Sequence, residues 1–413
     1  MSYPQEPSPK YSLAFRRLCL AILCERWAAF MLISTVAMML SQRFGFSRPS
    51  ALRLWGLVSA ASYVGALPGG YLLDRTSLPS RGIGLAALLL LLGYVALSVP
   101  LRAALYVALT LLIIGHALFK PSTQRFLAAI YPTGGRRLEE AQILLYFTAN
   151  LGAAAGSVLA GLLASYAGWE VTYSAAALLM SLGVFFLSRA DPPKSEPILS
   201  TDTHDSLQTE TRPLEIPNRA SIIAGLILAM FLFSLCTAQV EGAILLWASD
   251  RIDPVLVGFV IPIAWFLAFP AVLVLLLTPI QLALLPRLKE RIGLCRLIAT
   301  GLLAASAVFA VLLPTTLWPS RVSMGWLAAS LCCFVIAELL IAPLGLSLLL
   351  RCTPKRLLGA VTGLWYSAGA LGYYIGGEIG ALWSKWPTQR VLTLLAILPL
   401  FGAAALSVQK PKL

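Results

Sequence analysis

The sequence predicts an all-α membrane protein with twelve transmembrane helices in two six-helix bundles and with both termini in the cytoplasm. Three observations predict this class: an apolar composition, a series of apolar runs of membrane-spanning length, and one polar stretch between two apolar blocks of near-equal size. Of the 413 residues, 59% are apolar and only 12% are charged. A soluble chain carries about one quarter charged residues, so this chain lacks the polar surface to coat a soluble globule.

Each apolar run is expected to be a helix, because a backbone that crosses lipid must satisfy its own hydrogen bonds. About 20 apolar residues make one helical crossing, whereas a barrel strand needs about ten alternating residues, and this alternation is absent from the sequence. The twelve predicted helices span residues 13–42, 54–74, 82–100, 102–131, 140–166, 169–189, 220–248, 255–285, 294–314, 322–351, 357–384 and 389–408.

A single long polar stretch separates the sixth and seventh predicted helices. It covers residues 190–219 and is rich in Asp, Glu, Pro, Ser and Thr, a composition typical of a disordered linker. The chain is therefore expected to form an N-terminal bundle over residues 1–189, a cytoplasmic linker, and a C-terminal bundle over residues 220–413.

The two apolar blocks share a local match. Residues 146–152 and 366–372 both begin with Tyr, end with Leu-Gly and lie 220 residues apart, and Gly156 and Gly376 keep the same offset. The match indicates a duplicated half. Shared packing chemistry is the alternative, because small residues at four-residue spacing let any two membrane helices approach closely.

Lysine and arginine in the loops predict the orientation. If the N-terminus is cytoplasmic, the cytoplasmic segments hold 20 of these residues and the outer loops hold 8. This positive-inside bias places both termini in the cytoplasm of a multi-pass protein in the cytoplasmic membrane, and it accounts for the net charge of +13 without nucleic-acid binding. Arg43, Arg48 and Arg53 in the first outer loop run against the bias, and the sequence alone provides no reason for them.

Ionisable residues inside the apolar helices are candidate functional residues, because centring one in a bilayer costs at least about 2.5 kcal/mol. Glu25 and Arg26 lie near the middle of the first helix. They form either a static pair between helices or a carboxylate that exchanges a proton beside a fixed guanidinium. His116 is left out of the expected site, because a lone histidine more often satisfies a helix contact.

Lys120 in the fourth helix and Glu338 in the tenth are the central pair of the expected site. The 220-residue offset places Glu338 opposite position 118, so the two side chains are expected at nearly equal heights in opposite halves. A contact between them would close one gate, and protonation of Glu338 or the arrival of a substrate amine would release it. Pro121 and Pro343 follow the two residues and weaken the local helices.

Several polar and aromatic residues accompany this pair. Tyr146 and Asn150 share a helix face because they are four residues apart. Like Trp365, they either line a cavity or hold helices together. Gln239 and Glu241 in the seventh helix point to different faces, so at most one of them is expected to face the cavity.

The loop after the second predicted helix resembles a signature of the major facilitator superfamily, which is also built from two six-helix bundles and a linker. It reads Gly70-Tyr-Leu-Leu-Asp74-Arg75, with Arg81 further on, and is similar to GxxxDR followed by a basic residue. The glycine permits close helix contact, and Asp74 can engage helix N-termini or neighbouring arginines. The resemblance implies a gating role for Gly70, Asp74, Arg75 and Arg81.

Further motifs resemble the proton-dependent oligopeptide transporter family within that superfamily. Glu25-Arg26-Trp27 is similar to the end of the family's ExxERF element. The other motifs follow in the family's order: Gly115 to Pro121, Tyr131-Pro132, Arg136-Arg137, Tyr146 to Gly152, Ala238-Gln239, Ile261-Pro262, Trp265-Phe266, Glu338 to Ser347, and Gly363 to Gly377.

This resemblance implies proton-coupled uptake of di- and tripeptides by alternating access. Glu25, Arg26 and Glu338 would couple protons, Lys120 would attract the peptide carboxylate, and Glu338 with Asn150 would take the amino terminus. The implied substrate-binding set is Lys120, Tyr146, Asn150, Gln239, Glu338, Trp365 and Ser367. The resemblance implies no cofactor besides protons and no metal, and the fold can work as a monomer in the lipid bilayer.

The chain also departs from the family. Apolar residues replace the family's usual polar ones at Ile22, Ala29, Phe30, Ile33 and Phe269. The pocket is therefore expected to be partly apolar, which leaves a changed substrate or an altered proton stoichiometry open.

Two other functions stay open. The first keeps the fold and either exports amphiphilic compounds by proton exchange or imports a non-peptide metabolite, which the apolar replacements favour. The second is a non-transporting membrane sensor, although the linker contains no recognisable signalling domain. An enzyme is not expected, because the sequence shows no nucleophile arrangement, metal set or phosphate loop.

Overall fold

The computed structural model describes residues 11–74, 79–131, 135–190, 219–256, 258–353 and 357–409. The described elements up to residue 190 are α1 (Leu13–Ile33), α2 (Val36–Gln42), α3 (Arg48–Asp74), α4 (Pro79–Ser98), α5 (Arg102–Ile130), α6 (Gly135–Tyr166) and α7 (Trp169–Ser188).

The elements after residue 218 are α8 (Arg219–Ala238), the π-helix η1 (Gln239–Ala243), α9 (Ile244–Arg251), the strands β1 (Val255–Leu256) and β2 (Phe259–Val260), the 3₁₀ helix η2 (Ile263–Leu267), α10 (Ala268–Ile292), α11 (Leu294–Ala310), the 3₁₀ helix η3 (Leu313–Leu317), α12 (Met324–Cys352), α13 (Leu358–Leu382) and α14 (Thr388–Ser407). The two short strands pair antiparallel in one hairpin.

The described part of the chain is helical and has the lengths of a membrane-spanning protein. Nine helices are long and apolar enough to cross a membrane, and the bent pair α1 and α2 makes a tenth if it is counted as one span. The helices α3 and α13 have 27 and 25 residues, which is also enough for a crossing. The predicted all-α membrane class is confirmed.

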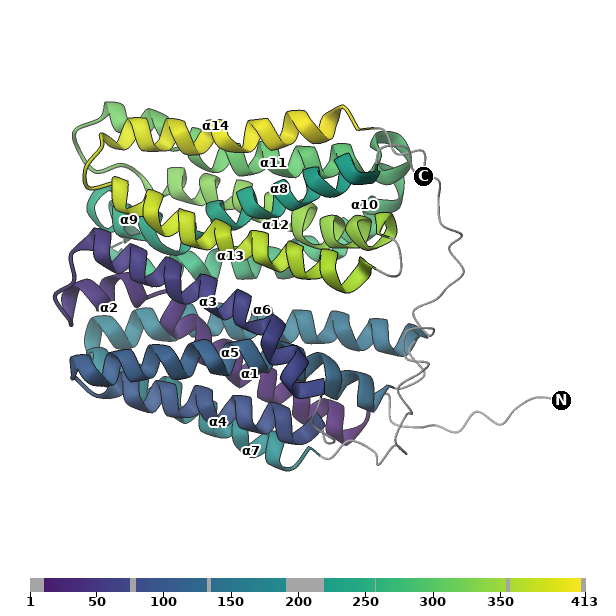
Figure 1. Cartoon of the computed structure of the whole chain (residues 1–413). Coiled ribbons are helices and arrows are strands. Elements are labelled where there is room, and N and C mark those ends of the chain that lie inside the picture. The colour runs from purple at the N-terminus through teal and green to yellow at the C-terminus, as the bar shows by residue number, and fades with distance from the viewer. Residues whose placement is uncertain are drawn as a thin grey trace.

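The helices form two groups, each around its own core. Figure 1 shows α1 to α7 in the lower group and α8 to α14 in the upper group. One large apolar core is drawn from residues between 14 and 190 and the other from residues between 222 and 406. The predicted linker over residues 190–219 lies, apart from its two end residues, outside the described residues.

The two ends of the bundle can be told apart by chain direction. We call the end at which α1 begins and α14 ends the terminal end, and the opposite end, where α2 leads into α3, the distal end (Figure 1). Successive long helices run in alternate directions, so α3 and α5 begin at the distal end while α6 and α13 begin at the terminal end.

The first predicted span is broken where the sequence pattern was continuous. The axis bends by 47° between α1 and α2. At the break, the Ser34 hydroxyl donates to the carbonyl of Phe30 and the Thr35 hydroxyl donates to the carbonyl of Met31, each at 2.6 Å. Hydroxyls that bond back to the preceding turn compete with the helical ladder and bend it, an effect that hydropathy does not register.

The seventh and eighth predicted helices also differ from simple runs. The π-helix η1 interrupts the seventh span and adds a residue to one turn, which shifts every side chain after it around the axis. The eighth predicted helix covers residues 255–285, whereas the structure places the β1 and β2 hairpin and η2 before α10 begins at Ala268. Pro262 precedes η2 in an extended conformation, as expected of a residue that cannot continue a helical hydrogen-bond ladder.

Equivalent glycines hold equivalent helix pairs together in the two halves. A Cβ atom at Gly152 of α6 would lie 2.7 Å from the carbonyl oxygen of Leu23 in α1, and one at Gly372 of α13 would lie 2.8 Å from the Cβ of Ser234 in α8. In lipid there is no hydrophobic force between helices, so close backbone approach at small residues supplies much of the attraction. The repeated sequence match thus corresponds to a repeated helix contact.

We expect Gly152→Ala to destabilise the protein. The added methyl would displace α1 from α6, a kind of overpacking that typically costs about 1–3 kcal/mol. Thermal unfolding of the purified protein in detergent should show a lower melting temperature. Gly84→Ala in α4 is the matched control, since its Cβ would meet no atom within 4 Å, and it should leave the melting temperature unchanged or raise it. Equal melting temperatures for the two variants would contradict the packing role of Gly152.

Candidate functional site

The two halves are joined at the distal end by ion pairs. Arg48 of α3 binds Asp250 of α9 through two hydrogen bonds, one of 2.9 Å from Nη2 to Oδ1. Arg53 of α3 donates from Nε to Glu378 of α13 at 2.9 Å. Arg53 and Glu378 are 47% and 44% exposed, so each pair is of the surface type that stabilises by about 0–1 kcal/mol. Pairs this weak can hold one conformation without preventing another.

Close backbone approach supports the ion pairs at the same end. A Cβ at Gly56 of α3 would lie 2.8 Å from the Cα of Gly377 and 2.8 Å from the carbonyl oxygen of Tyr373 in α13. The indole nitrogen of Trp265 donates to the carbonyl of Val158 at 3.0 Å, which links η2 to α6. The described halves are thus in direct contact at the distal end.

The three arginines of the first outer loop now have a physical explanation. Arg48 and Arg53 form the ion pairs between the halves. Arg43 donates to the last carbonyls of α4, Leu97 and Ser98, at 2.9 and 2.8 Å, and to Glu170 at 3.0 Å. All three positive charges therefore have nearby acceptors in the folded structure.

Glu25 and Arg26 form the pair that the sequence suggests. Arg26 donates to both carboxylate oxygens of Glu25, at 2.5 and 2.6 Å. Glu25 is only 1% exposed, so its charge depends on protein partners. His116 of α5 is a further partner of this carboxylate, because its Nδ1 lies 3.4 Å from Oε1 of Glu25. The sequence interpretation left His116 out of the site as a lone histidine in a helix contact. Its partner Glu25 lies on a different helix, and no local pattern in the sequence links the two.

Lys120 belongs to a chain of contacts that crosses between the halves. Its ammonium lies 4.4 Å from the ring centroid of Tyr63 in α3, within the range of a cation–π interaction. Tyr63 stacks on Tyr373 of α13 with ring centroids 5.3 Å apart, and the Tyr373 hydroxyl donates to Glu241 at 3.4 Å. A cation of the N-terminal half is thereby connected to an anion of the C-terminal half through two aromatic rings.

Glu338 lies in the same neighbourhood without a direct partner. Its charge is close enough to interact with Glu241 and with Tyr146. The charge of Lys120 also interacts with Glu241. Within the described part of the chain its carboxylate has no hydrogen bond or ion pair, so the expected contact between Lys120 and Glu338 does not form in this conformation. Asn150 donates to the Tyr146 carbonyl one turn away at 3.0 Å.

Gln239 occupies a different position from the one expected of a substrate-binding residue. Its side chain is fully buried, its Nε2 donates to the carbonyl of Gly376 at 2.6 Å, and its Oε1 accepts from Trp383 at 3.2 Å. These bonds join η1 to α13. Glu241, two residues on within the same π-helix, points to another face and contacts Tyr373 instead. We call the residues around Lys120 the charged cluster; it comprises Glu25, Arg26, Tyr63, His116, Lys120, Glu241, Glu338 and Tyr373. In this conformation Glu241 is the residue of the seventh span that joins it.

The remaining expected substrate residues lie on α13. Trp365 is 3% exposed and its ring packs against Gly345 of α12, so it holds two helices together in this conformation. Ser367 is half-buried, two residues further along the same helix.

The expected gating residues are only partly described. Gly70 and Asp74 lie in the last turns of α3, and Arg81 is exposed near the start of α4, all at the terminal end. Arg75 lies outside the described residues, as does the side chain of Asp74.

The positions with apolar replacements fall into two groups. Ile22 and Ala29 are buried in the N-terminal half. Ile33 packs against the cores of both halves, Phe269 packs against the C-terminal core, and Phe30 packs against the small alanine cluster between α6 and α10. The second group therefore makes the contact between the halves more apolar.

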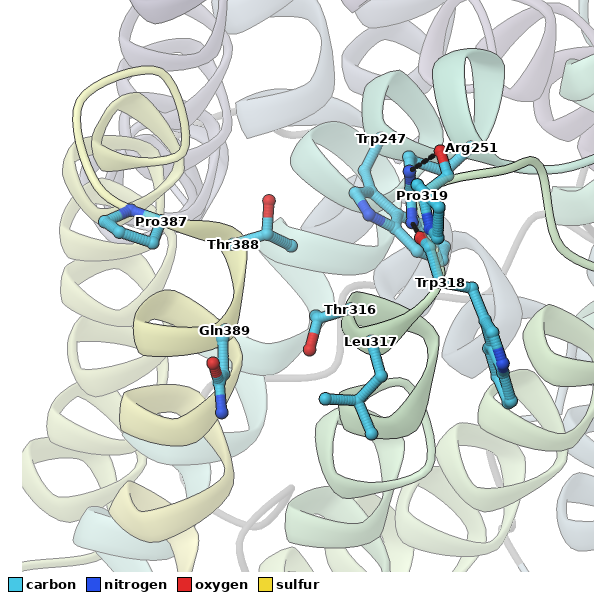
Figure 2. Close-up of a pocket in the computed structure, with 9 residues that line it drawn as sticks. All are labelled: Trp247, Arg251, Thr316, Leu317, Trp318, Pro319, Pro387, Thr388 and Gln389. Carbon is cyan, nitrogen blue, oxygen red and sulfur yellow. Dashed lines mark hydrogen bonds between the residues drawn. The ribbon is translucent and has the colours of Figure 1, made fainter.

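A separate pocket of about 470 Å³ opens at the distal end of the C-terminal half. Figure 2 shows Trp247, Arg251 and Pro319 on one side and residues at the start of α14 on the other. Arg251 donates to the carbonyls of Thr315, Trp318 and Pro319, so it closes the loop after η3. The pocket lies apart from the charged cluster and contains none of its residues.

Four residues of the cluster were not selected from the sequence: Tyr63, His116, Glu241 and Tyr373. His116 and Glu241 are charged or titratable residues in apolar helices, so their position in the sequence was a usable signal. Tyr63 and Tyr373 are ordinary aromatic residues in a membrane helix, and only their pairing across the halves distinguishes them.

The fold and the charged cluster define a membrane protein whose two helical halves meet around buried ionisable groups and close against each other at one end. The family model of the Major Facilitator Superfamily matches residues 18–377. The chain belongs to this superfamily, and it is a transporter-family protein, not an enzyme.

Similar proteins agree with this assignment. The chain is 24% identical over 440 residues to the peptide transporter YePEPT of Yersinia enterocolitica subsp. palearctica, covering 87% of this chain and 86% of that protein. It is 24% identical to dipeptide and tripeptide permease A of Escherichia coli K12, with 92% and 87% covered. A crystal structure of the peptide transporter POT in complex with sulfate has the same fold, with a TM-score of 0.86, 20% identity and coverage of 98% and 96%.

We expect the pair between Arg53 and Glu378 to favour closure of the distal end. Arg53→Glu would place two carboxylates together, and the double variant Arg53→Glu with Glu378→Arg would restore the attraction. A cysteine at Leu52, which is 5% exposed beside Gly380, reports opening through labelling by a membrane-impermeant maleimide. The single reversal should speed labelling about two- to five-fold, and the double variant should return it toward the original rate.

A cysteine at Leu101 is the control for this experiment, because this side chain is 60% exposed at the same end. Its labelling should be equal in all backgrounds. If labelling at position 52 is also equal in all backgrounds, the ion pair does not contribute to closure.

Proposed function

We propose that the protein takes up di- and tripeptides, or peptide-like molecules, together with protons by alternating access. The observation that carries this proposal is the placement of Lys120 on one half and of Glu241 and Glu338 on the other, around the stacked rings of Tyr63 and Tyr373. A short peptide is a zwitterion, and it needs one cation and one anion a few residues apart in a site dry enough to strengthen both. The similar proteins named as peptide transporters support the same substrate class.

In this proposal each charged group of the site has one task. Lys120 leaves the ring of Tyr63 to bind the peptide carboxylate. Glu338, which has no protein partner in the described part of the chain, binds the amino terminus together with Asn150. Tyr146, Trp365 and Ser367 complete the expected set around the peptide.

Protons are the proposed coupling ion and the only cofactor. Glu25 and Arg26 hold a buried pair whose carboxylate can accept a proton, and Glu338 is the second expected proton site. A protonated complex with net positive charge would be drawn inward by the membrane potential, which supplies about 2.3 kcal/mol per charge per 100 mV.

We infer twelve spans with both termini in the cytoplasm of a cell whose cytoplasmic membrane holds the protein. The count adds α3 and α13 to the nine apolar spans and the bent pair of α1 and α2. The loop charges support this orientation, so the distal end would face outward and the conformation would be closed to the outside. The bundles would comprise residues 1–189 and 220–413, joined by the cytoplasmic linker 190–219, and would work as a monomer.

The gating residues fit this orientation. Gly70, Asp74, Arg75 and Arg81 would lie at the cytoplasmic end, in the last turns of α3, the connection after it and the start of α4. Their proposed task is to stabilise the conformation that is closed on the cytoplasmic side, where Asp74 can engage neighbouring arginines.

A second candidate keeps the mechanism and changes the cargo. Ile33, Phe30 and Phe269 make the region between the halves more apolar, which favours an amphiphilic compound or a non-peptide metabolite, taken up or exported. Against it stand Lys120 and Glu338, two opposite charges that an apolar cargo does not need.

The first test is the uptake of labelled dialanine and trialanine into proteoliposomes with an inward proton gradient and a negative interior. The proposal predicts uptake that the gradient stimulates and that other dipeptides, but not free alanine, inhibit. If folded protein takes up neither peptide, the substrate class is wrong. A thermal-shift screen of amphiphiles and metabolites would then identify the cargo.

Substitution of the central charges tests their roles. We expect Lys120→Ala and Glu338→Ala each to lower peptide uptake at least about ten-fold, because each removes a charge-assisted contact worth about 1.5–3 kcal/mol. Lys385→Ala and Glu290→Ala are matched controls, since both residues are exposed and lie outside the cluster. Expression and melting temperature should stay unchanged in all four variants. Full activity in either of the first two would exclude the assigned role.

A further inference from the structure

His116 joins a buried ion pair that is already complete without it. Arg26 satisfies both oxygens of Glu25, yet the imidazole Nδ1 lies only 3.4 Å from Oε1. Histidine is the side chain whose ordinary titration falls within the physiological range of pH. The imidazole is therefore placed where its charge state changes the balance of a buried group.

The surroundings of His116 contain few other charges. On α1 it faces Glu25 and Arg26, and on its own helix it faces Lys120. The neighbouring helix α4 contributes Tyr94, which is fully buried near Glu25 and Arg26, and α3 contributes Tyr63, which acts on Arg26. Among the described residues, Glu25 is thus the single anion that acts on the imidazole.

The protonation state of His116 determines the net charge of the group of residues next to Lys120, which are Glu25, Arg26 and His116 itself. With a neutral imidazole, Glu25 and Arg26 sum to zero. With a protonated imidazole, the three residues sum to one positive charge. Lys120 lies four residues after His116, so the two share a face of α5 and their side chains are neighbours. Protonation therefore raises the positive potential at the place where Lys120 lies.

We propose that His116 is a proton-binding residue that couples the Glu25 and Arg26 pair to anion binding at Lys120. The inference deepens the proposed function, since the anion would be the peptide carboxylate. Nδ1 of the neutral imidazole donates its N–H toward Glu25, a proton from water adds to Nε2, and the added charge attracts the carboxylate to Lys120. Loss of that proton to water on the other side weakens the binding and releases the peptide.

Thermodynamic linkage makes the coupling reciprocal. If the proton on His116 strengthens anion binding by some factor, the anion strengthens proton binding by the same factor. The proposal therefore predicts an effect on the imidazole itself, which can be measured without any transport.

The chain offers a matched control for this measurement, because it contains only two histidines and the other one, at position 204, lies outside the described residues. In the variant His204→Gln, all histidine NMR signal from isotope-labelled protein comes from His116. We expect this signal to change with pH as the imidazole gains and loses its proton. Saturating dialanine should increase the protonated fraction at a given pH. Glu25→Gln, which removes the facing anion, should lower that fraction about two-fold or more near pH 6.

Transport supplies the second readout. In His116→Gln, uptake driven by the proton gradient should fall about ten-fold and lose its dependence on pH, while exchange of labelled for unlabelled dialanine across the membrane should continue. His204→Gln should behave as the unmodified protein. A merely structural role for His116 would lower both kinds of transport together.

The outcomes separate this inference from the proposed function. If the unmodified protein takes up no peptide, the substrate proposal fails, and the titration of His116 with and without Glu25 still decides whether the proton site exists. If the His116 signal does not titrate, or if His116→Gln keeps the pH dependence of uptake, the inference is wrong while peptide transport stands. If Glu25→Gln fails to fold, the titration of His116 with and without dialanine decides instead, and an unchanged protonated fraction would contradict the inference.

Discussion

The structure depends on one constraint, which is that a charge inside a bilayer is costly unless it has a partner. Centring an isolated charge in lipid costs several kcal/mol, and the protein meets this cost in two ways. Glu25 and Arg26 neutralise each other within one helix, one residue apart. Lys120 has no carboxylate partner within the described residues and rests on an aromatic ring. In the first arrangement each charge has an opposite charge as its neighbour, whereas the second leaves a cation available.

The same constraint shapes the contact between the two halves. Helices in lipid gain no hydrophobic energy by packing together, so they approach through glycine and alanine. Gly56 and Gly377 let α3 and α13 meet almost backbone to backbone, and the exposed pair of Arg53 and Glu378 adds a weak attraction beside them. A contact made of shallow packing and half-exposed ion pairs can be broken at modest cost, as a transporter that alternates between two conformations requires.

Hydropathy alone was enough for most of the fold, since it reports how many apolar residues follow one another and a membrane helix needs little else. It could not locate the bend at Ser34 and Thr35 or the π-helix at Gln239, because both arise from hydrogen bonds and not from apolarity. Gln239 and Glu241 lie inside this π-helix and point to different faces, and it is Glu241 that contacts Tyr373. The sequence also could not show that His116 belongs to the site, because its partner Glu25 becomes a neighbour only when α1 and α5 pack together.

The position of Lys120 also explains how the site can bind and release cargo. A direct ion pair between Lys120 and Glu338 would have to separate for each substrate, and until the substrate's own charges arrive this leaves two buried charges unpaired. A cation over an aromatic face gains only about 0.5–2 kcal/mol, so a carboxylate can displace Tyr63 from Lys120 with energy to spare. Because Tyr63 stacks on Tyr373, movement of Lys120 away from this ring also changes the contact between α3 and α13. Binding at the centre is thereby linked to the helices that close the distal end. The link runs through Tyr63 and Tyr373, which are uncharged, so their rings can separate without exposing or burying a charge.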